Sequence, residues 1–308
     1  MEWSIRTDLA LESRECFTKE KDELRGVRFF EESVGKNIRI STVLIETENA
    51  AKQLHRPRGH YITIEDTQMT EGDASQHRDL SRVLAQCVRA LIRESKTSKT
   101  HPELFHIRDF VEKVDCASAL VVGLGNRQVT PDALGPSVVD QLSITRHILR
   151  EFGSYAYGTM GTCSVSAIVP GVMAQTGMEC AEILKGIVEK TRPQVMVTVD
   201  ALAARSIHRL SRTIQLSDTG ITPGSGVGNH RHAIDASSMG IPVISIGVPT
   251  VVDAATIVHD AMEGEGTERI ERISPQLNTM FVTSKNVDDE IRQLSFLIAE
   301  GLNQTFQV

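Results

Sequence analysis

The stretch that decides the fold is Ala117-Ser118-Ala119-Leu120-Val121-Val122-Gly123-Leu124-Gly125-Asn126. Its apolar, β-branched half predicts a strand that is buried on both faces, and its glycines predict a tight turn where that strand ends. From here to the C-terminus, short apolar runs alternate with amphipathic segments, which is the pattern of a largely parallel sheet flanked by helices. We therefore expect an α/β fold whose main part spans about residues 115–308.

Further strands and helices follow from the same two periodicities. Strands are expected where segments are short and apolar enough for a sheet interior: Ala117–Val122, Ser166–Pro170, Val195–Val199, Thr213–Leu216 and Val243–Val248. Helices are expected where apolar residues recur every three or four positions: Ser75–Glu94, Pro136–Arg150, Glu179–Lys190, Ala201–Arg209 and a closing helix from about Asp288. Before the main part, the β-like runs Ile38–Ile45 and Tyr61–Ile64 predict a smaller strand-containing region at about residues 30–72.

The composition is that of an ordinary globular protein of 308 residues with 40% hydrophobic content. The 33 basic and 40 acidic residues give a formal net charge of -7, which argues against a general affinity for nucleic acid or anionic membranes. The five cysteines show no C-x-x-C spacing and are expected to be free thiols in a reducing compartment. Neither a signal peptide nor a membrane span is found, so a cytoplasmic location is expected.

The glycine-rich turn around Gly123 and Gly125 has two interpretations. A dinucleotide-binding turn would need G-x-G-x-x-G opening directly into a helix, but residue 128 is Gln, and Thr130-Pro131 intervenes before a helix can start. The other interpretation is a tight turn at the end of a strand. In either case, Asp132 follows just beyond the carboxyl end of a buried strand, where the ligands and reacting groups of open α/β sheets collect.

Asp132 and Asp200 occupy similar positions in this pattern. Thr130 is expected to cap a helix that has Pro131 as its first residue, which puts Asp132 in the first turn, where the helix dipole favours an ionised carboxylate. Asp200 follows the expected strand Val195–Val199 and precedes another expected helix. Each aspartate could simply stabilise the start of its helix. If the two strands are neighbours, however, both carboxylates lie over one edge of the sheet.

Two carboxylates at one sheet edge can serve acid–base chemistry or metal binding. At a separation of about 3 Å they cannot both ionise, so one keeps a proton while the other activates water for attack on a peptide carbonyl. This arrangement is a protease mechanism in outline.

Two other motifs suggest different chemistry. Asp218-Thr219-Gly220 spells the triplet of pepsin-like proteases, but those enzymes need two copies in an all-β framework, so a turn is expected here. His230 and His232 flank Arg231 and could bind a metal, with His230 as the candidate ligand, although the chain contains no H-E-x-x-H motif. The same cluster could instead supply positive charge near an acidic substrate.

Several segments together resemble one family, the germination proteases of spore-forming bacteria. They are Ser4–Ala10, Gly123–Pro136, Val199–Ala203 and Leu216–Asp253, which occur in the family's order. The likeness covers most of the chain, and the run from Ser217 to Asn229 is its most specific part. The family is similar in fold to the hydrogenase-maturation endopeptidases, in which the acidic residues matching Asp132 and Asp200 engage a metal.

The resemblance implies an activity and the residues that perform it. It implies an endopeptidase that initiates the degradation of small acid-soluble spore proteins during germination, with Asp132 and Asp200 as the catalytic pair. No cofactor is expected, and the participation of a metal ion is left open. The resemblance further implies a homotetramer that works in the forespore and spore core, with no nucleic acid or membrane as a direct partner.

The resemblance also implies a zymogen that cleaves itself after an acidic residue and before a hydrophobic residue followed by alanine. Asp8-Leu9-Ala10 fits this rule, so residues 1–8 are expected to form a propeptide and residues 9–308 the peptidase domain. The preferred sites carry a second acidic residue four positions before the bond, where this chain has Ile5. Cationic partners for the acidic side chains of a substrate are expected among the arginines nearest the site in sequence: Arg127, Arg205, Arg209 and Arg231.

Two alternatives remain open on the sequence. The first is a metal-dependent peptidase that uses the same aspartates together with a histidine such as His230. The second is a non-catalytic binding member of the fold, in which the aspartates only begin helices.

Overall fold

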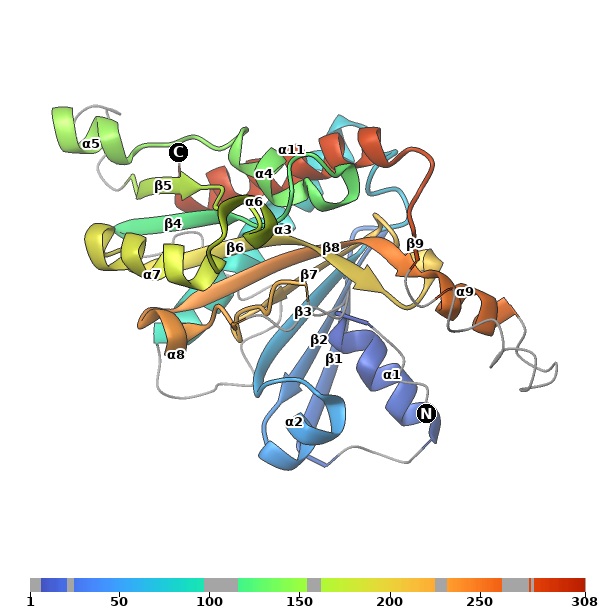
Figure 1. The fold of residues 1–308 in the computed structure, drawn as a ribbon. Helices are drawn as coiled ribbons and strands as arrows, with labels where there is room; N and C mark the ends of the chain where they lie inside the picture. The colour runs from blue at the N-terminus through green and yellow to red at the C-terminus, as the bar shows by residue number, and fades with distance from the viewer. Residues whose placement is uncertain are drawn as a thin grey trace.

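A computed structural model describes residues 7–20, 25–96, 116–153, 162–224, 232–261, 277 and 280–307 of the chain. Its strands form one sheet in the order β1-β2-β3-β7-β8-β6-β4-β5, with β9 paired to β8 (Figure 1). The strands are β1 (Val27–Val34), β2 (Ile38–Ile45), β3 (Gly59–Glu65), β4 (Ser118–Gly123), β5 (Ser164–Ile168), β6 (Val195–Ala204), β7 (Thr213–Ser217), β8 (Val243–Asp253) and β9 (Phe281–Val282).

The sheet has a parallel half and an antiparallel half. The pairs β5–β4, β4–β6 and β6–β8 are parallel. The pairs β8–β7, β7–β3, β3–β2 and β2–β1 are antiparallel. The expected α/β class is confirmed, but the sheet is mixed, not mostly parallel. A parallel crossover takes a dozen or more residues, and only residues 35–37 join β1 to β2, so this pair must be antiparallel.

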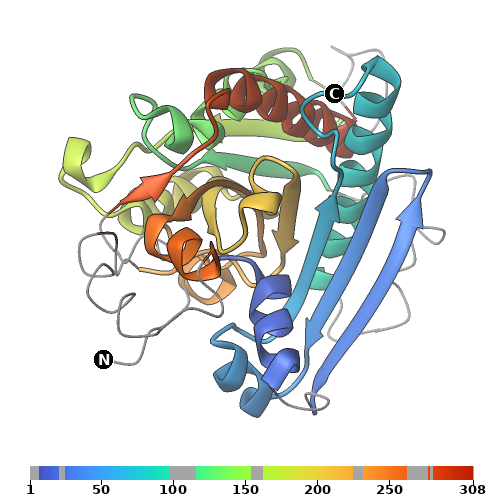
Figure 2. The same ribbon diagram turned by 90° about the vertical axis from the view of Figure 1, so that its right-hand side faces the viewer.

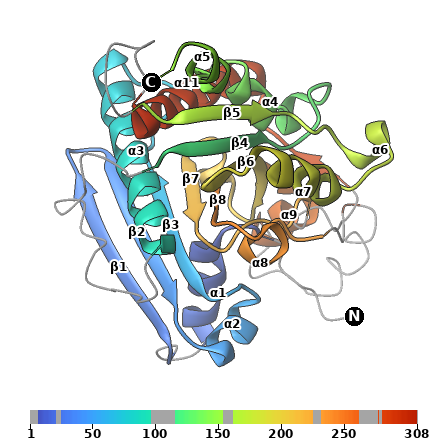
Figure 3. The same ribbon diagram turned by 90° about the vertical axis from the view of Figure 1, so that its left-hand side faces the viewer.

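The predicted strand-containing region at the N-terminal part of the chain extends this same sheet. β3 pairs with β7, so that Tyr61 lies opposite Ser217 and Thr63 lies opposite Gln215. Figure 3 shows β1–β3 in blue at one end of the sheet and β4 and β5 in green at the other.

Helices cover both faces of the sheet. The helices are α1 (Ala10–Glu20), α2 (Glu48–Leu54), α3 (Ala74–Lys96), α4 (Leu134–Val139), α5 (Arg146–Phe152), α6 (Met173–Thr176), α7 (Cys180–Thr191), α8 (Ala236–Met239), α9 (Ala254–Ala261) and α11 (Val287–Phe306). On one face, α3, α4 and α11 form the largest apolar core with the sheet, and Figures 2 and 3 show α3 and α11 packed side by side. On the other face, α7 and α8 pack near Met196, and α1 and α2 pack on β2 and β3.

The expected helix at Ala201–Arg209 is wrong. β6 continues through Ala204, because Ala203 and Ala204 pair with Val251 and Val252 of β8 and are almost fully buried. Only a short 3-10 turn, Ile207–Arg209, follows. Burial in the sheet overrides the helix propensity of this alanine-rich stretch.

The expected helix at Pro136–Arg150 is also wrong, since two short helices, α4 and α5, replace it. Thr145 lies between them and binds the chain at β5: its hydroxyl donates to the carbonyl of Cys163 at 2.6 Å and accepts from the backbone N–H of Val165 at 2.8 Å. These side chain–backbone bonds hold the segment in a non-helical conformation.

Candidate active site

The neighbouring strands β4 and β6 place Asp200 beside the glycine-rich turn. Gly123 pairs with Val199, and the backbone N–H of Leu124 donates to the carbonyl of Val199 at 2.8 Å. Asp200 is therefore in the interior of β6, not directly after a strand as expected, and it is only 5% exposed. Its Oδ1 accepts a hydrogen bond from the backbone N–H of Ala201 at 2.9 Å.

Asp132 belongs to the turn that follows β4. It ends a 3-10 turn, Thr130–Asp132, not the first turn of an α-helix, and its Oδ2 accepts from the backbone N–H of Asn126 at 2.7 Å. The hydroxyl of Thr250 in β8 donates to the carbonyl of Pro131 at 2.7 Å. The turn is thus fixed both to its own preceding loop and to the centre of the sheet.

The glycines of this region permit close packing of backbone on backbone. A Cβ on Gly135 would lie 2.3 Å from the carbonyl oxygen of Leu124 and 2.4 Å from that of Val199. Gly125 has φ +109°, and a Cβ there would lie 2.0 Å from the carbonyl oxygen of Asp132. Contacts under 3 Å are not tolerated, so side chains at either position would push the Asp132 turn off the β4–β6 edge. The glycines bring Asp132 to the sheet, which supports the strand-end interpretation of this turn.

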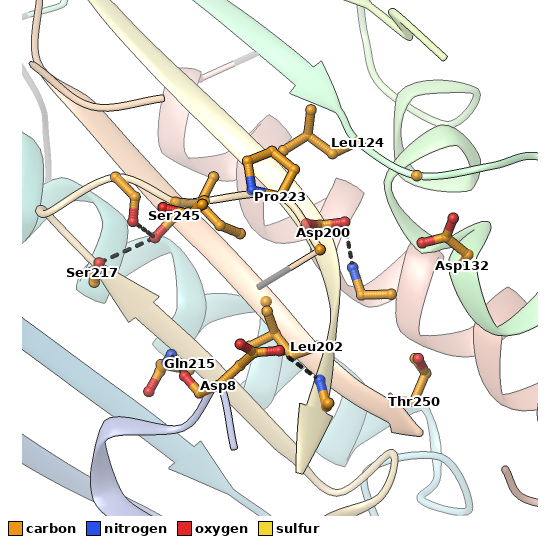
Figure 4. Close-up of a pocket in the computed structure, with 18 of the residues that line it drawn as sticks. Asp8, Leu124, Asp132, Asp200, Leu202, Gln215, Ser217, Pro223, Ser245 and Thr250 are labelled. Atoms are coloured by element: carbon orange, nitrogen blue, oxygen red, sulfur yellow. Dashed lines mark hydrogen bonds between the residues drawn. The ribbon is translucent and has the colours of Figure 1, made fainter. Parts of the chain in front are cut away.

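Both carboxylates line one cavity of about 630 Å³ on the α7–α8 side of the sheet. Figure 4 shows Asp200 on β6 and Asp132 on the adjacent turn, both at this cavity. The sequence prediction that the two aspartates meet at one edge of neighbouring strands is consistent with this arrangement. Such a half-enclosed hollow with convergent polar groups is typical of a small-molecule or peptide site.

Asp8 lines the same cavity. The backbone N–H of Asp8 donates to the carbonyl of Ala203 at 2.9 Å, and the N–H of Ala203 donates back to the Asp8 carboxylate at 2.9 Å. Leu9 is completely buried in an apolar cluster with Leu202, Ala204 and Val252. Asp8 therefore lines the cavity that holds the two aspartates, and Leu9 is buried next to it, although nothing in their sequence neighbourhood shows this.

The arginines predicted to contact substrate lie elsewhere or outside the described residues. Arg127 forms an ion pair with Asp140 at the surface, and neither residue lines the cavity. Arg209 is tied to Glu12, Glu15 and Glu65, and together with Arg205 it lines a second hollow beyond α1. Arg231 falls outside the described residues.

The sequence analysis missed Arg56, a cation that does line the active-site cavity. Its guanidinium donates from Nη2 to the carbonyl of Thr7, the residue before Asp8. Arg56 comes from the loop after α2, about 75 residues before Asp132, and no periodicity or motif links it to the aspartates. Only the packing of α2 against the sheet brings it there.

The Asp218-Thr219-Gly220 triplet forms the bend after β7, as predicted, and its Thr219 and Gly220 line one wall of the cavity. The backbone N–H of His60 donates to Asp218 Oδ1 at 2.8 Å, and its Nδ1 lies 2.7 Å from Oδ2. Tyr61 donates its hydroxyl to the carbonyl of Pro57, and burial raises the pKa of this hydroxyl to about 12, so it stays neutral at physiological pH. Asp218 thus ties the bend to β3.

The described residues can be searched for a metal site and for cysteine thiols. Among the residues it describes, no three His, Cys, Asp or Glu side chains cluster closely enough to hold a metal ion. The candidate ligand His230 lies outside the described residues. Cys87, Cys116, Cys163 and Cys180 are buried, and Sγ of Cys163 lies 3.6 Å from Sγ of Cys116. None of the helices in the described ranges is long and apolar enough to cross a membrane.

Comparison with known proteins identifies relatives along nearly the whole chain. A family model described as germination protease matches residues 5–265. The chain is 39% identical to a germination protease of Clostridium perfringens strain 13, over 99% of this chain and 96% of the relative. It is 42% identical to one from Caldanaerobacter subterraneus subsp. tengcongensis, over 98% and 94%, respectively.

One solved structure with a weaker likeness is the [NiFe] hydrogenase maturation protease HycI from Thermococcus kodakarensis KOD1. It aligns with a TM-score of 0.32 and 18% identity, over 61% of this chain and 94% of that one. The match over residues 5–265 and the full-length relatives, by contrast, are decisive: this chain belongs to the germination protease family of peptidases.

Proposed function

We propose that this chain is the endopeptidase that initiates the degradation of small acid-soluble spore proteins during germination, with Asp132 and Asp200 as its acid–base pair. The observation that carries the proposal is that both carboxylates line one cavity, which Asp8, the residue before the expected cut, also lines. The preference for Glu or Asp before the cut bond, then a hydrophobic residue and alanine, matches the sequence of that segment.

The mechanism requires the two carboxylates to take opposite protonation states. One accepts a proton from water as the water oxygen attacks the carbonyl carbon of the substrate. The other donates its proton to the departing amide nitrogen when the C–N bond breaks. The products are a new carboxyl group and a new amine, and one water molecule is consumed. Burial of Asp200 strengthens the electrostatic interactions of its carboxyl group with the water and the substrate, because the low-dielectric interior screens charge less than water does.

The same site would act first on its own chain. Cleavage between Asp8 and Leu9 removes residues 1–8 and leaves a peptidase that begins at Leu9. Assembly as a homotetramer and action in the forespore and spore core, without direct contact with nucleic acid or membrane, belong to the same proposal. The predicted substrate contacts of four arginines stay predictions: Arg127, Arg205, Arg209 and Arg231. The first three do not line the cavity, and Arg231 lies outside the described residues.

The experiment that tests the proposal has two arms. The full chain is incubated under acidic conditions and its new N-terminus is sequenced, with Leu9 as the expected first residue. The form that begins at Leu9 is then mixed with a small acid-soluble spore protein, and the cut bonds are mapped by mass spectrometry. Cleavage after acidic residues is expected. Cuts without this preference, or no cuts at all, would contradict the proposed activity.

A chelation arm separates this mechanism from the metal-dependent alternative, in which Asp132, Asp200 and His230 hold an ion. Exhaustive chelation is expected to leave the cleavage rate unchanged. A rate that is lost on chelation and restored by one divalent metal would favour the metal-dependent peptidase instead.

A further inference from the structure

One side chain holds the Asp8-Leu9-Ala10 segment from both sides of the bond that would be cut. Gln215 of β7 accepts, through Oε1, the backbone N–H of Ala10 at 2.6 Å. Through Nε2 it donates to the carbonyl oxygen of Asp8 at 3.0 Å. That carbonyl is the one in the Asp8–Leu9 peptide bond. Figure 4 shows Gln215 next to Asp8 at the wall of the cavity.

The strand register relates Gln215 to the catalytic pair. Asp200 of β6 pairs with Gly247 of β8, and Gly247 pairs with Gln215 of β7. Residues in direct register across a sheet point to the same face, and neighbouring strands lie about 4.8 Å apart. Asp200 and Gln215 therefore project into the same hollow two strands apart. Gly247 between them carries no side chain, and Leu202 fills the space above it.

We propose that Gln215 is the residue that grips the substrate main chain at the cut bond: its amide N–H donates to the carbonyl that is attacked, and its amide oxygen accepts the N–H two residues later. This inference rests on the proposed function. The inference extends the proposed function in two ways. It names a residue that contacts the reacting atoms, and it states which backbone groups the substrate must offer. The ligand is a peptide segment with an acidic residue, a large aliphatic residue and then a residue that has a backbone N–H.

The contact at the carbonyl has a direct chemical use. When water adds to the carbonyl carbon, its oxygen becomes an oxyanion, and a donor about 2.7–3.1 Å from that position stabilises the transition state. The oxyanion then collapses, the bond to the Leu9 nitrogen breaks, and that nitrogen receives a proton from the acidic carboxyl. Gln215 itself gains and loses no proton in this sequence.

The contact at the N–H of Ala10 explains why the segment lies in one register. Leu9 is held by the apolar cluster of Leu202, Ala204 and Val252, and Asp8 by the backbone of Ala203. The amide of Gln215 fixes the chain on the other side of the bond. A proline in place of Ala10 would remove the N–H that Gln215 accepts. Since Ala10 is the first residue of α1, where proline is well tolerated, the helix would still form.

The test measures the first-order rate at which the full chain loses residues 1–8, in wild type and four variants. Gln215→Glu keeps the acceptor for Ala10 but loses the donor, and Gln215→Leu loses both. Ala10→Pro removes the N–H and also replaces the alanine side chain that the proposed cleavage rule calls for. The control is Gln194→Leu, because Gln194 also accepts from a backbone N–H, that of Ala117, but at the far end of the sheet. Thermal unfolding of every variant shows whether it is folded.

We expect Gln215→Glu and Gln215→Leu to cleave about 10²–10³-fold more slowly, which is the usual effect of losing one oxyanion donor. Ala10→Pro should be about fivefold slower, and Gln194→Leu unchanged. A folded Gln215→Glu variant that cleaves within twofold of wild type overturns the inference and leaves the proposed function intact. A folded wild-type chain that never exposes Leu9 overturns both. If a Gln215 variant fails to fold, Ala10→Pro decides the question by itself. An unchanged cleavage rate in the Ala10→Pro variant would contradict the proposed contact between Gln215 and the substrate main chain.

Discussion

The two faces of the central sheet are built from the same strands but differ in what they do. Along β6, Val197 and Val199 point into the apolar core under α3, α4 and α11, while Thr198 and Asp200 point to the opposite face. Along β8, Ile246 belongs to the first face and Gly247 to the second. The alternation of a strand puts stabilising and reactive side chains one residue apart, so substitutions at adjacent positions should have separable effects.

The two faces also differ in how they are closed. The α3–α11 face is sealed by two long helices that pack on each other. The other face is covered at its ends by α1 and α2 and by α7 and α8, which leaves a cavity over β6, β8 and β7. The floor of this cavity on the strands includes polar or small residues, Asp200, Gln215, Ser217, Ser245 and Gly247, beside apolar ones such as Leu202. A hollow of this kind reduces the buried apolar area, so the opposite face must supply most of the stability.

The largest effect is expected on the reactive face. Asp200→Asn should lower the cleavage rate by about 10²–10⁴-fold, because the amide cannot exchange a proton with water or the leaving amine. The fold should persist, since the two side chains have nearly the same shape. The measurement is the rate of spore-protein cleavage together with the thermal unfolding midpoint. The matched control is Val199→Ala, one residue away on the other face, which should lower stability and spare the rate per folded molecule.

On the sealed face, Ile246→Ala should lower the free energy of unfolding by about 2–5 kcal/mol, because a buried aliphatic side chain is lost and a cavity remains. Urea unfolding measures this change. Cleavage per folded molecule should stay close to wild type. A strong loss of activity with unchanged stability would show that the two faces are not separable in this way.

The close contact of Gly135 with the backbone of Leu124 and Val199 predicts an intermediate effect on the cleavage rate. Gly135→Ala should reduce cleavage about 10²-fold, because its Cβ would collide with the carbonyls of Leu124 and Val199 and displace Asp132, and misplacement by about 1 Å can have that effect. Steady-state kinetics measure it. Gly186→Ala in α7 is the control, since a Cβ there meets nothing within 4 Å. Equal rates in the two variants would remove the structural role assigned to Gly135.

The smallest effect is expected at Thr250, which anchors the Asp132 turn. Thr250→Val removes the hydrogen bond to the carbonyl of Pro131 and should cost about 1 kcal/mol of stability, with up to about fivefold in the cleavage rate. The comparison variant is Thr191→Val, which loses a similar bond to Ile187 at the end of α7. Only the Thr250 variant should change the rate; a rate that falls in both would point to a general effect of stability.

The sequence predicted local features well and long-range ones poorly. The strand Ile38–Ile45 and the helix around Ser75–Glu94 carry their own periodicity, and both are confirmed. The extension of β6 through Ala201–Ala204 was missed because its pairing with β8 decides it, and the sequence Ala-Leu-Ala-Ala has no strand signal of its own. α1 and β1 were missed for the same reason: their sequences are rich in charged residues, and the helix and the strand form only where they pack against neighbouring elements.

The candidate site shows the same division. The approach of Asp132 and Asp200 to one cavity could be predicted, because each follows a recognisable apolar run of sequence. Gln215 and Arg56 could not, since a glutamine in a short strand and an arginine in a loop have no local signature. The place of Gln215 depends on β7 pairing with β8, where it lies opposite Gly247, and the place of Arg56 depends on how α2 packs on the sheet.

The central claim is that Asp132 and Asp200 act as one acid–base unit, and a double-mutant cycle tests it most directly. Cleavage rates are measured for Asp132→Asn, Asp200→Asn and the double variant, each shown to be folded. Groups that work as a unit give strongly non-additive losses, so the double variant should be about as slow as the slower single variant. Losses that multiply, or a single variant that retains full activity, would contradict the account.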